Sequence, residues 1–425
     1  MVAKGSEAIF ATTQPYRYAM YAAEGGRPEG KKRLEHLADG EDLDAAWADI
    51  ALSFMAANED RSRDALDFAR RAKAADPDLP NVFYALKNVD GNLGHDENLR
   101  ADLLGSSNAL ALHGAEYWTS GTIEPQIRFD SSRVMILSGD YRDAFRQLGS
   151  GIGGSLFLRA IAAAAMHDRA RALDAANRLV RAETGLSDTA EDAFKARTLL
   201  AIDVGNWNGA LDTLQNLEIY ARALEKKYRA GGAFSGISAA PEMRIFVRPW
   251  SAYVLARTRQ FAKAEALLSG LPADCDICGR MRGRVAALRH DWRTASWWFV
   301  LVAARSPDIP FAETDWGQML LLDGKPDEAI AKFALVHAKG PHFADPLEMW
   351  GEALMQKNRS DLALAKFEEA NKYAPNWGRL HLKWGTALSY LGKRAEAKQQ
   401  FAIAARLDLS RADAAVLARA RPKHV

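Results

Sequence analysis

Small and aromatic residues recur at a fixed interval in the last third of the chain. A glycine returns every 34 residues, an alanine stands twelve positions after each glycine, and a phenylalanine stands four positions after each alanine. The three series are Gly283, Gly317, Gly351 and Gly385; Ala295, Ala329, Ala363 and Ala397; and Phe299, Phe333, Phe367 and Phe401. Small residues let two helices approach closely, and an aromatic ring fills the gap to the next unit. The pattern therefore predicts pairs of antiparallel helices that repeat along the chain.

Proline closes three of these units, at Pro307, Pro341 and Pro375, whereas Leu409 takes its place in the fourth. A proline cannot continue a helix, so it predicts the end of the second helix of each pair. This order of small residue, small residue, phenylalanine and proline resembles the tetratricopeptide (TPR) repeat, a helix-turn-helix unit of 34 residues. The resemblance covers about residues 44–411 and is specific over 276–411. It implies an all-α fold, a right-handed α-α superhelix of about nine or ten helix pairs without a sheet.

The expected organisation has five parts. Residues 1–43 form a helical lead-in, 44–224 hold degenerate repeats, 225–242 form a flexible glycine-rich insertion, 243–411 hold regular repeats, and 412–425 form a capping helix and tail. Four units, at 276–309, 310–343, 344–377 and 378–411, keep strict register. Residues 90–126, which contain five glycines, are interpreted as a degenerate repeat with a long loop. Ser410 and Asp413 have the spacing of a capping box and predict a last helix that ends near Ala420.

The residues of the first helix in each unit carry the binding hypothesis. The resemblance implies that this helix lines a concave groove, with Arg280, Arg284, Thr314, Gln318, Glu348, Glu352, Leu382 and Thr386 at groove positions. Arg280 and Arg284 lie four residues apart on one helical face, so both guanidinium groups can reach one carboxylate or phosphate. They are similar to the basic pair of the TPR carboxylate clamp, although the asparagines of that clamp are missing. Trp316, Trp350 and Trp384 share the period of 34 and are predicted to pack in the core.

Charge is unevenly distributed although the chain as a whole is almost neutral. The 425 residues contain 56 Lys and Arg and 54 Asp and Glu, which gives no general attraction to nucleic acid or anionic lipid. Residues 1–124 hold 13 basic against 21 acidic residues, whereas 218–308 hold 15 against 8. Either this asymmetry aids solubility, or it orients an oppositely charged protein partner.

No targeting or membrane segment is evident. The longest apolar run, 295–304, has about half of the roughly 20 residues that a bilayer crossing needs. The first 25 residues lack the apolar block of a secretory signal, and only two cysteines occur. We therefore expect no membrane insertion, a reducing compartment and a cytoplasmic location.

Two short motifs have an ordinary structural explanation. Residues 149–154 satisfy the spacing of a dinucleotide-binding loop, but a helix is predicted before them where that motif needs a strand, so an interhelical turn is favoured. Cys275 and Cys278 have the CxxC spacing of metal-binding or redox pairs. Without a second cysteine pair, a structural pair at a helix start is favoured, and a regulatory disulfide is the alternative.

No catalytic residues, cofactor or metal site are predicted. The nine histidines are scattered. The groups formed by His95, Asp96 and Glu97 and by His113 and Glu116 are explained more simply as solvated polar residues than as metal ligands.

The favoured function is a non-enzymatic scaffold that binds a peptide or helix of a partner protein in its groove, with an acidic partner segment suggested by Arg280 and Arg284. The amino-acid sequence of residues 343–354 is similar to that of TPR regions in bacterial multidomain signalling proteins. A regulatory module whose effector is separate or absent is therefore the first alternative, because about 43 residues before the repeats are too few for an effector domain. An α-solenoid enzyme or RNA binder is the second alternative. An RNA-reading repeat needs similar polar residues in successive units, which Arg280, Thr314, Glu348 and Leu382 do not provide.

Overall fold

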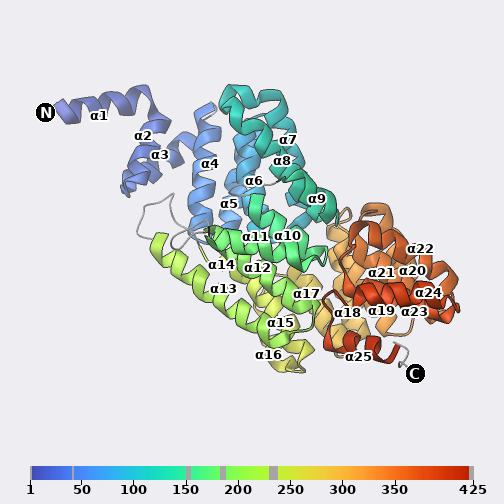
Figure 1. The fold of residues 1–425 in the computed structure, drawn as a ribbon. Coiled ribbons are helices and arrows are strands. Elements are labelled where there is room, and N and C mark those ends of the chain that lie inside the picture. Colours follow the sequence, from blue (N-terminus) through green and yellow to red (C-terminus); the bar gives the residue numbers. More distant parts are fainter. Residues whose placement is uncertain (1, 41–42, 150–154, 182–187, 229–237, 421–425) are drawn as a thin grey trace. The chain divides into compact units, whose positions relative to one another are not determined.

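The structure is a computed structural model that describes residues 2–40, 43–149, 155–181, 188–228 and 238–420. Within these ranges all regular elements are helices, and no strand occurs among them (Figure 1). The chain divides into two compact units: Met1–Ser131 with Glu218–Ile245, called unit 1, and Ser132–Leu217 with Phe246–Val425, called unit 2. The predicted all-α fold is confirmed for the described residues. None of their helices is long and apolar enough to span a bilayer.

Unit 1 begins with three helices in the predicted lead-in, α1 (Val2–Thr13), α2 (Pro15–Glu24) and α3 (Pro28–Ala38). It continues with α4 (Leu43–Asn58), α5 (Ser62–Ala75), α6 (Pro80–Leu93), α7 (Asp96–Tyr117) and α8 (Ser120–Leu137), and the division between the units falls within α8. The helices α2 and α3, α4 and α5, and α6 and α7 pack as consecutive pairs. Proline opens α2, α3 and α6, where its missing N–H is not needed and its fixed φ suits the helix.

The long loop predicted within 90–126 is wrong. Helices α6, α7 and α8 cover this stretch almost completely, with short turns after Leu93 and Tyr117. Its glycines serve helix packing instead. A Cβ on Gly105 would lie 2.3 Å from the Phe83 ring, and Gly94 ends α6 in a left-handed conformation with φ 74°.

The predicted insertion at 225–242 is helical at both of its ends. Helix α13 (Trp207–Tyr228) runs through residues 225–228, and α14 (Ala240–Glu242) leads into the π-helical turn η2 (Met243–Val247). Residues 229–237 lie outside the described residues, so the predicted flexibility of that stretch stays a prediction.

Unit 2 contains two groups of helices. The first group is α9 (Tyr141–Gln147), α10 (Ser155–Ala165), α11 (Arg169–Arg181), α12 (Asp188–Asp203) and the beginning of α13. Helix α9 precedes the glycine-rich motif, as predicted, while 150–154 lie outside the described residues. The second group starts with α15 (Arg248–Arg257) and α16 (Phe261–Ser269).

The four strict repeats follow in unit 2 as four helix pairs. They are α17 (Asp276–Leu288) with α18 (Trp292–Arg305), α19 (Phe311–Leu322) with α20 (Pro326–Lys339), α21 (Ala344–Gln356) with α22 (Ser360–Tyr373), and α23 (Gly378–Tyr390) with α24 (Arg394–Ala404). Figure 1 shows them from yellow to red. Pro307, Pro341 and Pro375 each stand two residues after the second helix of a pair, as predicted.

The repeated glycine and phenylalanine meet inside each pair. A Cβ added to Gly283, Gly317 or Gly351 would lie 2.4 Å from the ring of the phenylalanine sixteen residues later, so only glycine fits there. Phe299, Phe333 and Phe367 are fully buried. The periodic tryptophans pack partly buried against the same core, as predicted. The contact between glycine and phenylalanine fixes the distance between the two helices in each of these repeats.

The last pair is covered by α25 (Arg411–Ala420). The Ser410 hydroxyl accepts the Asp413 N–H at 3.1 Å and donates to the Asp413 carboxylate at 2.7 Å. The predicted N-cap hydrogen bond to Ser410 is confirmed, and α25 extends to Ala420, the last residue that the structure describes. Leu417 of α25 is buried against the core of the final repeat.

Candidate functional site

The two predicted groove arginines meet at one carboxylate of their own chain. Nε of Arg280 donates a hydrogen bond to Asp315 Oδ2 at 2.8 Å, and Nε of Arg284 lies 3.8 Å from Asp315 Oδ1. The arginines come from α17 and the aspartate from α19, the first helices of neighbouring repeats. The side chains of Arg280 and Arg284 are only 15% and 17% exposed, so this is a half-buried ion pair and not a solvated basic face.

Aromatic rings hold the same guanidinium groups from other sides. Arg280 lies 4.9 Å from the centre of the Phe311 ring, and Arg284 lies 4.1 Å from that of Tyr253. Both distances are within the range of cation–π attraction. Burial lowers the pKa of Arg284, but Tyr253 and Asp315 raise it by more, so the net shift is upward and the group stays charged.

Thr314 and Gln318, the groove positions of the next repeat, do not join this cluster. Thr314 is buried, and its hydroxyl donates to the Pro310 carbonyl one turn earlier in the chain at 2.8 Å. Gln318 is exposed. Of the four predicted residues on α17 and α19, the structure thus brings together only the arginines.

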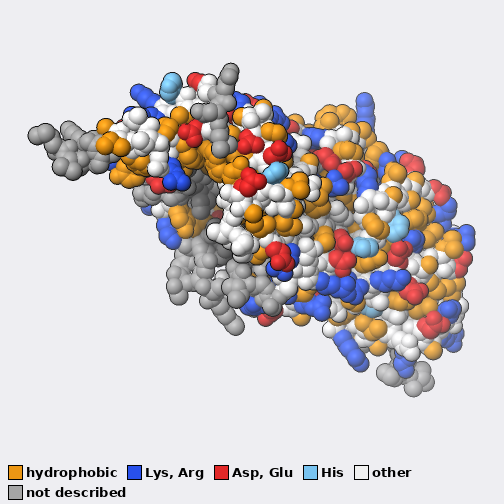
Figure 2. Space-filling view, turned by 90° about the horizontal axis from the view of Figure 1, so that it is seen from above, with side chains coloured by type: hydrophobic (Ala, Val, Ile, Leu, Met, Phe, Trp, Pro, Cys, Tyr) orange, Lys and Arg blue, Asp and Glu red, His pale blue; other side chains and the backbone are white. Residues whose placement is uncertain are grey.

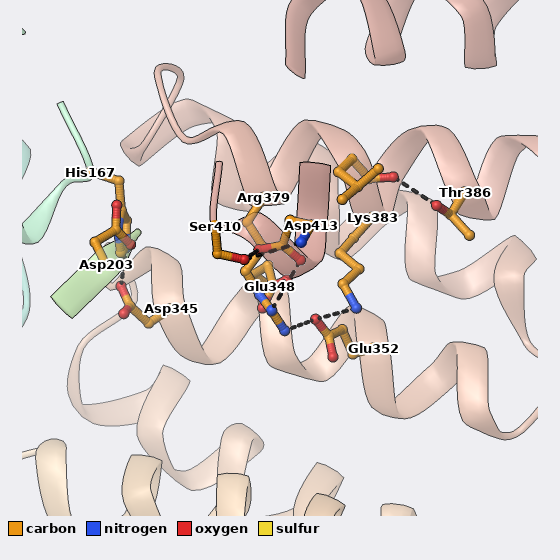
Figure 3. Close-up of polar contacts among 11 residues, drawn as sticks. His167, Asp203, Asp345, Glu348, Glu352, Arg379, Lys383, Thr386, Ser410 and Asp413 are labelled. Atoms are coloured by element: carbon orange, nitrogen blue, oxygen red, sulfur yellow. Dashed lines mark hydrogen bonds and ion pairs between the residues drawn. The ribbon is translucent and has the colours of Figure 1, made fainter. Parts of the chain in front are cut away.

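A second cluster surrounds the predicted groove residues Glu348 and Glu352 of α21 (Figure 3). Arg379 of α23 donates to Glu348 at 3.2 Å and also pairs with Glu352, while Lys383 lies 3.1 Å from Glu352. Arg379 further approaches Asp413 of α25 at 3.7 Å. The two acidic groove residues therefore pair with cations that no motif in the sequence singled out.

The two glutamates of this cluster titrate in opposite directions. Burial and the charge of Glu352 raise the pKa of Glu348 well above its ordinary value, although Arg379 opposes them. Burial also raises the pKa of Glu352, but Arg379 and Lys383 lower it by more, to about 2. Glu352 is thus the fixed negative charge of the cluster, and Glu348 is the carboxyl group that tends to hold a proton.

Both clusters have one design. In each cluster, the first helix of one repeat carries two residues of like charge, four positions apart. They pair with residues of opposite charge on the first helix of the next repeat. Asp315 and Lys383 occupy corresponding places in their repeats, two units apart. The first group holds two cations and one anion. In the second group the charges balance, because Arg379 and Lys383 face the carboxylates of Glu352 and Asp413 while Glu348 tends to hold a proton. The surface around Arg280 therefore keeps the larger uncompensated charge.

Turns of the two helix groups of unit 2 also contact each other. His167, between α10 and α11, lies between Asp203 at 2.7 Å and Asp345 at 3.3 Å (Figure 3). Burial lowers the pKa of His167, but the two carboxylates raise it by more, to about 10. Asn376 donates to Asp168 at 2.7 Å beside this histidine.

The turn before α21 makes a neighbouring contact of the same kind. The Phe343 ring lies 5.7 Å from that of Tyr141, edge to face, and covers Gly139, where a Cβ would come within 2.5 Å of it. His342 binds Asp140 at 2.9 Å. We call the contacts of residues 138–205 with residues 340–410 the seam of unit 2. No local sequence signal predicts it, because its partners lie about 180 to 240 residues apart.

Asp140, Asp143 and His342 form the single group of potential metal ligands found among the described residues. The sequence suggested two other places. His95 pairs with Asp90 at 2.8 Å, and His113 lies 3.4 Å from Glu116 in an exposed pair. A separate buried group in unit 1 joins Lys87, Ser106 and Asp130, with Lys87 Nζ 2.6 Å from Asp130 Oδ2.

Cys275 and Cys278 are joined by a disulfide and are fully buried. Cys275 is also the N-cap of α17, and its sulfur accepts the Cys278 N–H at 3.3 Å. The predicted position at a helix start is therefore confirmed, whereas a regulatory role of the disulfide, the alternative, stays a prediction.

The surface seen in Figure 2 mixes basic, acidic and apolar side chains, and neither sign of charge forms a continuous area on that face. The uneven charge counted along the sequence is therefore not visible there as a single charged patch. A role in orienting a partner stays a prediction.

No family model and no curated protein matches the chain. Similar solved structures include MamA AMB-1, with 22% identity over 38% of this chain and 97% of that one and a TM-score of 0.31. YrrB, described as a TPR protein with an unusual peptide-binding site, has 15% identity, covers 47% of this chain and 98% of its own, and gives a TM-score of 0.31. Yeast Tom70 has 12% identity to this chain. The match covers 98% of this chain and 94% of Tom70, with a TM-score of 0.41.

These low identities and TM-scores transfer no property to this chain, and the assignment rests on its own geometry. Four consecutive helix pairs follow the period of 34, each closed by a buried contact between glycine and phenylalanine. Residues 276–411 of the chain therefore have the helix-pair architecture that the resemblance to the tetratricopeptide repeat implied.

Proposed function

We propose that the protein is a non-enzymatic scaffold that binds a segment of a partner protein along the first helices of its repeats. The observation that carries the proposal is the meeting of Arg280 and Arg284 at Asp315. Two guanidinium groups share one carboxylate, so the group has a net positive charge. A partner segment with an Asp or Glu side chain supplies the second carboxylate.

The geometry of arginine supports this binding mode. A guanidinium has five N–H donors, and the hydrogen bond from Arg280 to Asp315 uses Nε. Asp315 and Phe311 hold the Arg280 side chain in place, which reduces the entropy lost when a ligand binds. A charge-assisted contact of this type is worth about 1.5 to 3 kcal/mol.

The test is to replace both arginines by glutamine and to measure the affinity for the partner. Glutamate is unsuitable, because it would place two further carboxylates beside the buried Asp315. The matched control replaces Lys263 and Arg293 by glutamine. These exposed residues lie on the second helices α16 and α18 and give the same change in net charge.

Proteins that co-purify with the tag-free chain from cells that express it naturally are identified first, and each is then titrated in purified form. We expect the arginine variant to bind at least tenfold more weakly, and wild-type binding to weaken with added salt. The control variant should bind like the wild type. Equal affinity of wild type and arginine variant would refute the proposed site.

A further inference from the structure

An imidazole and two carboxylates from distant parts of unit 2 converge at the seam. Asp140 caps α9 and Asp143 lies in its first turn, while His342 comes from the turn between α20 and α21. One oxygen of each aspartate and one ring nitrogen of His342 all lie within 4.8 Å of one another. Nδ1 of His342 is 2.9 Å from Asp140 Oδ2 and 3.7 Å from Asp143 Oδ2.

Each of the three side chains is held in place by a contact on its other side. The Asp140 Oδ1 atom accepts the Asp143 N–H at 3.4 Å, and Asp143 Oδ1 accepts from Arg146 at 3.0 Å. The His342 ring stacks on Tyr373, with centroids 4.8 Å apart. In metal sites, outer contacts of this kind orient the ligands and fix the donor atoms that face the ion. Here they leave Oδ2 of both aspartates directed at the imidazole.

The charges of the group favour a cation. Two carboxylates with a neutral imidazole carry two negative charges, of which Arg146 compensates one at the outer side of Asp143. The side chains of His342, Asp140 and Asp143 are 39%, 20% and 39% exposed, so an ion can reach them from solvent.

We propose that Asp140, Asp143 and His342 bind a divalent transition metal, and that zinc is the best match. Zinc accepts histidine nitrogen together with carboxylate oxygen, whereas magnesium and calcium prefer ligand sets made of oxygen alone. The bound ion links the start of α9 to the turn before α21 and so fastens the seam beside Phe343 and Tyr141. The proposal does not rest on partner binding at Arg280.

The fastening has a thermodynamic consequence. The ligands come from segments about 200 residues apart, so the unfolded chain does not hold them together. A ligand that binds only the folded state raises the free energy of unfolding. Zinc therefore stabilises unit 2 when Asp140, Asp143 and His342 are intact.

The experiment uses the tag-free full chain, stripped with a chelator and dialysed into chelator-free buffer. Zinc is titrated in by calorimetry, magnesium is titrated in parallel, and cobalt is added to a second sample to record the absorption bands of a nitrogen- and oxygen-ligated ion. The variants are His342→Gln and Asp143→Asn. His113→Gln is the matched control, because His113 also lies beside an acidic residue but forms no group of three potential ligands among the residues that the structure describes.

We expect one saturable zinc site, no comparable magnesium binding, and a melting temperature that rises by several degrees with zinc. Both site variants should lose affinity at least tenfold and lose the rise in melting temperature, while His113→Gln behaves like the wild type. Circular dichroism of the metal-free variants verifies that they fold. The proposal is overturned if wild-type protein binds no zinc at 100 micromolar, on the order of a weak metal site, or if the folded variants bind it as tightly as wild type.

Discussion

The imidazole of His167 lies flat against the indole of Trp377, with ring centroids 3.8 Å apart and an angle of 7° between the planes. His167 belongs to the turn between α10 and α11, and Trp377 precedes α23. The backbone of His167 has a φ of 59°, in the left-handed region that non-glycine residues seldom adopt. The turn is thus held in a costly conformation in which the ring meets Trp377, Asp203 and Asp345 together.

We predict that His167→Gln makes the protein less stable below neutral pH and that the difference disappears at high pH. The pKa of His167 in the folded protein is raised from 6.5 to about 10. A raised folded pKa means that the protonated ring stabilises the fold fully below about pH 6.5, and that this contribution is lost as the pH rises through about 10. Melting temperatures at pH 6, 8 and 10 measure it. His36→Gln, an exposed histidine on α3, is the control, and a pH-independent loss in His167→Gln would contradict the prediction.

We predict opposite effects for the two glutamates of α21. The lowered pKa of Glu352, about 2, means that its charged form stabilises the fold above its unfolded pKa and that this contribution is lost as the pH falls toward 2. Glu352→Gln should therefore be destabilising at neutral pH.

Glu348→Gln should be tolerated, because the raised pKa of Glu348 means that the folded state favours its protonated form, which glutamine resembles. Wild-type stability should fall as the pH rises above about 4.5, and this variant should lose part of that dependence. Urea unfolding of both variants at pH 5 and pH 8 distinguishes them. A larger loss at pH 8 for Glu348→Gln than for Glu352→Gln would show that the charge assignment is reversed.

We predict that Gly351→Ala destabilises the repeat although alanine is the better helix former. Its Cβ would lie 2.4 Å from the buried Phe367 ring, so the two helices must separate. Overpacking costs about 1 to 3 kcal/mol, against a gain in helix propensity of about 1 kcal/mol. Gly121→Ala, which meets no atom within 4 Å, should be neutral or slightly stabilising. Denaturant unfolding of both proteins is the measurement, and equal losses would show that the close contact does not determine stability.

We predict that the disulfide contributes modestly and is protected in the folded protein. It closes a short loop, for which the entropy model gives about 2 kcal/mol, and both cysteines are fully buried. In the double variant Cys275→Ser, Cys278→Ala, the serine hydroxyl can accept the N-cap hydrogen bond of α17 that the Cys275 sulfur accepts in the wild type. We expect this variant to fold with a small loss in melting temperature. Thiol titration after mild reduction should detect free cysteines only when denaturant is present, and rapid labelling of native protein would contradict the predicted protection.

The repeats from 276 to 411 could be predicted from the sequence because their signal is local and periodic. The contact of Gly283 with Phe299 spans sixteen residues, and the Ser410 cap spans three, so each lies within one pair or one turn of helix. The loop predicted within 90–126 is wrong because glycine also occurs inside helices, where it allows close packing. Gly105 permits close packing against Phe83 inside two long helices, and a glycine count cannot separate that from a loop.

Only the tertiary structure determined which charges meet. The sequence placed Arg280 and Arg284 on one helical face, but their partner Asp315 comes from the next repeat and has no periodic equivalent of like charge. The seam depends on residues such as His342 and Asp140, which are about 200 positions apart and approach only when successive helix pairs have stacked. Local periodicity determines the shape of each helix pair, whereas pairing between distant turns follows from the accumulated rotation of many pairs, which no single segment of the sequence encodes.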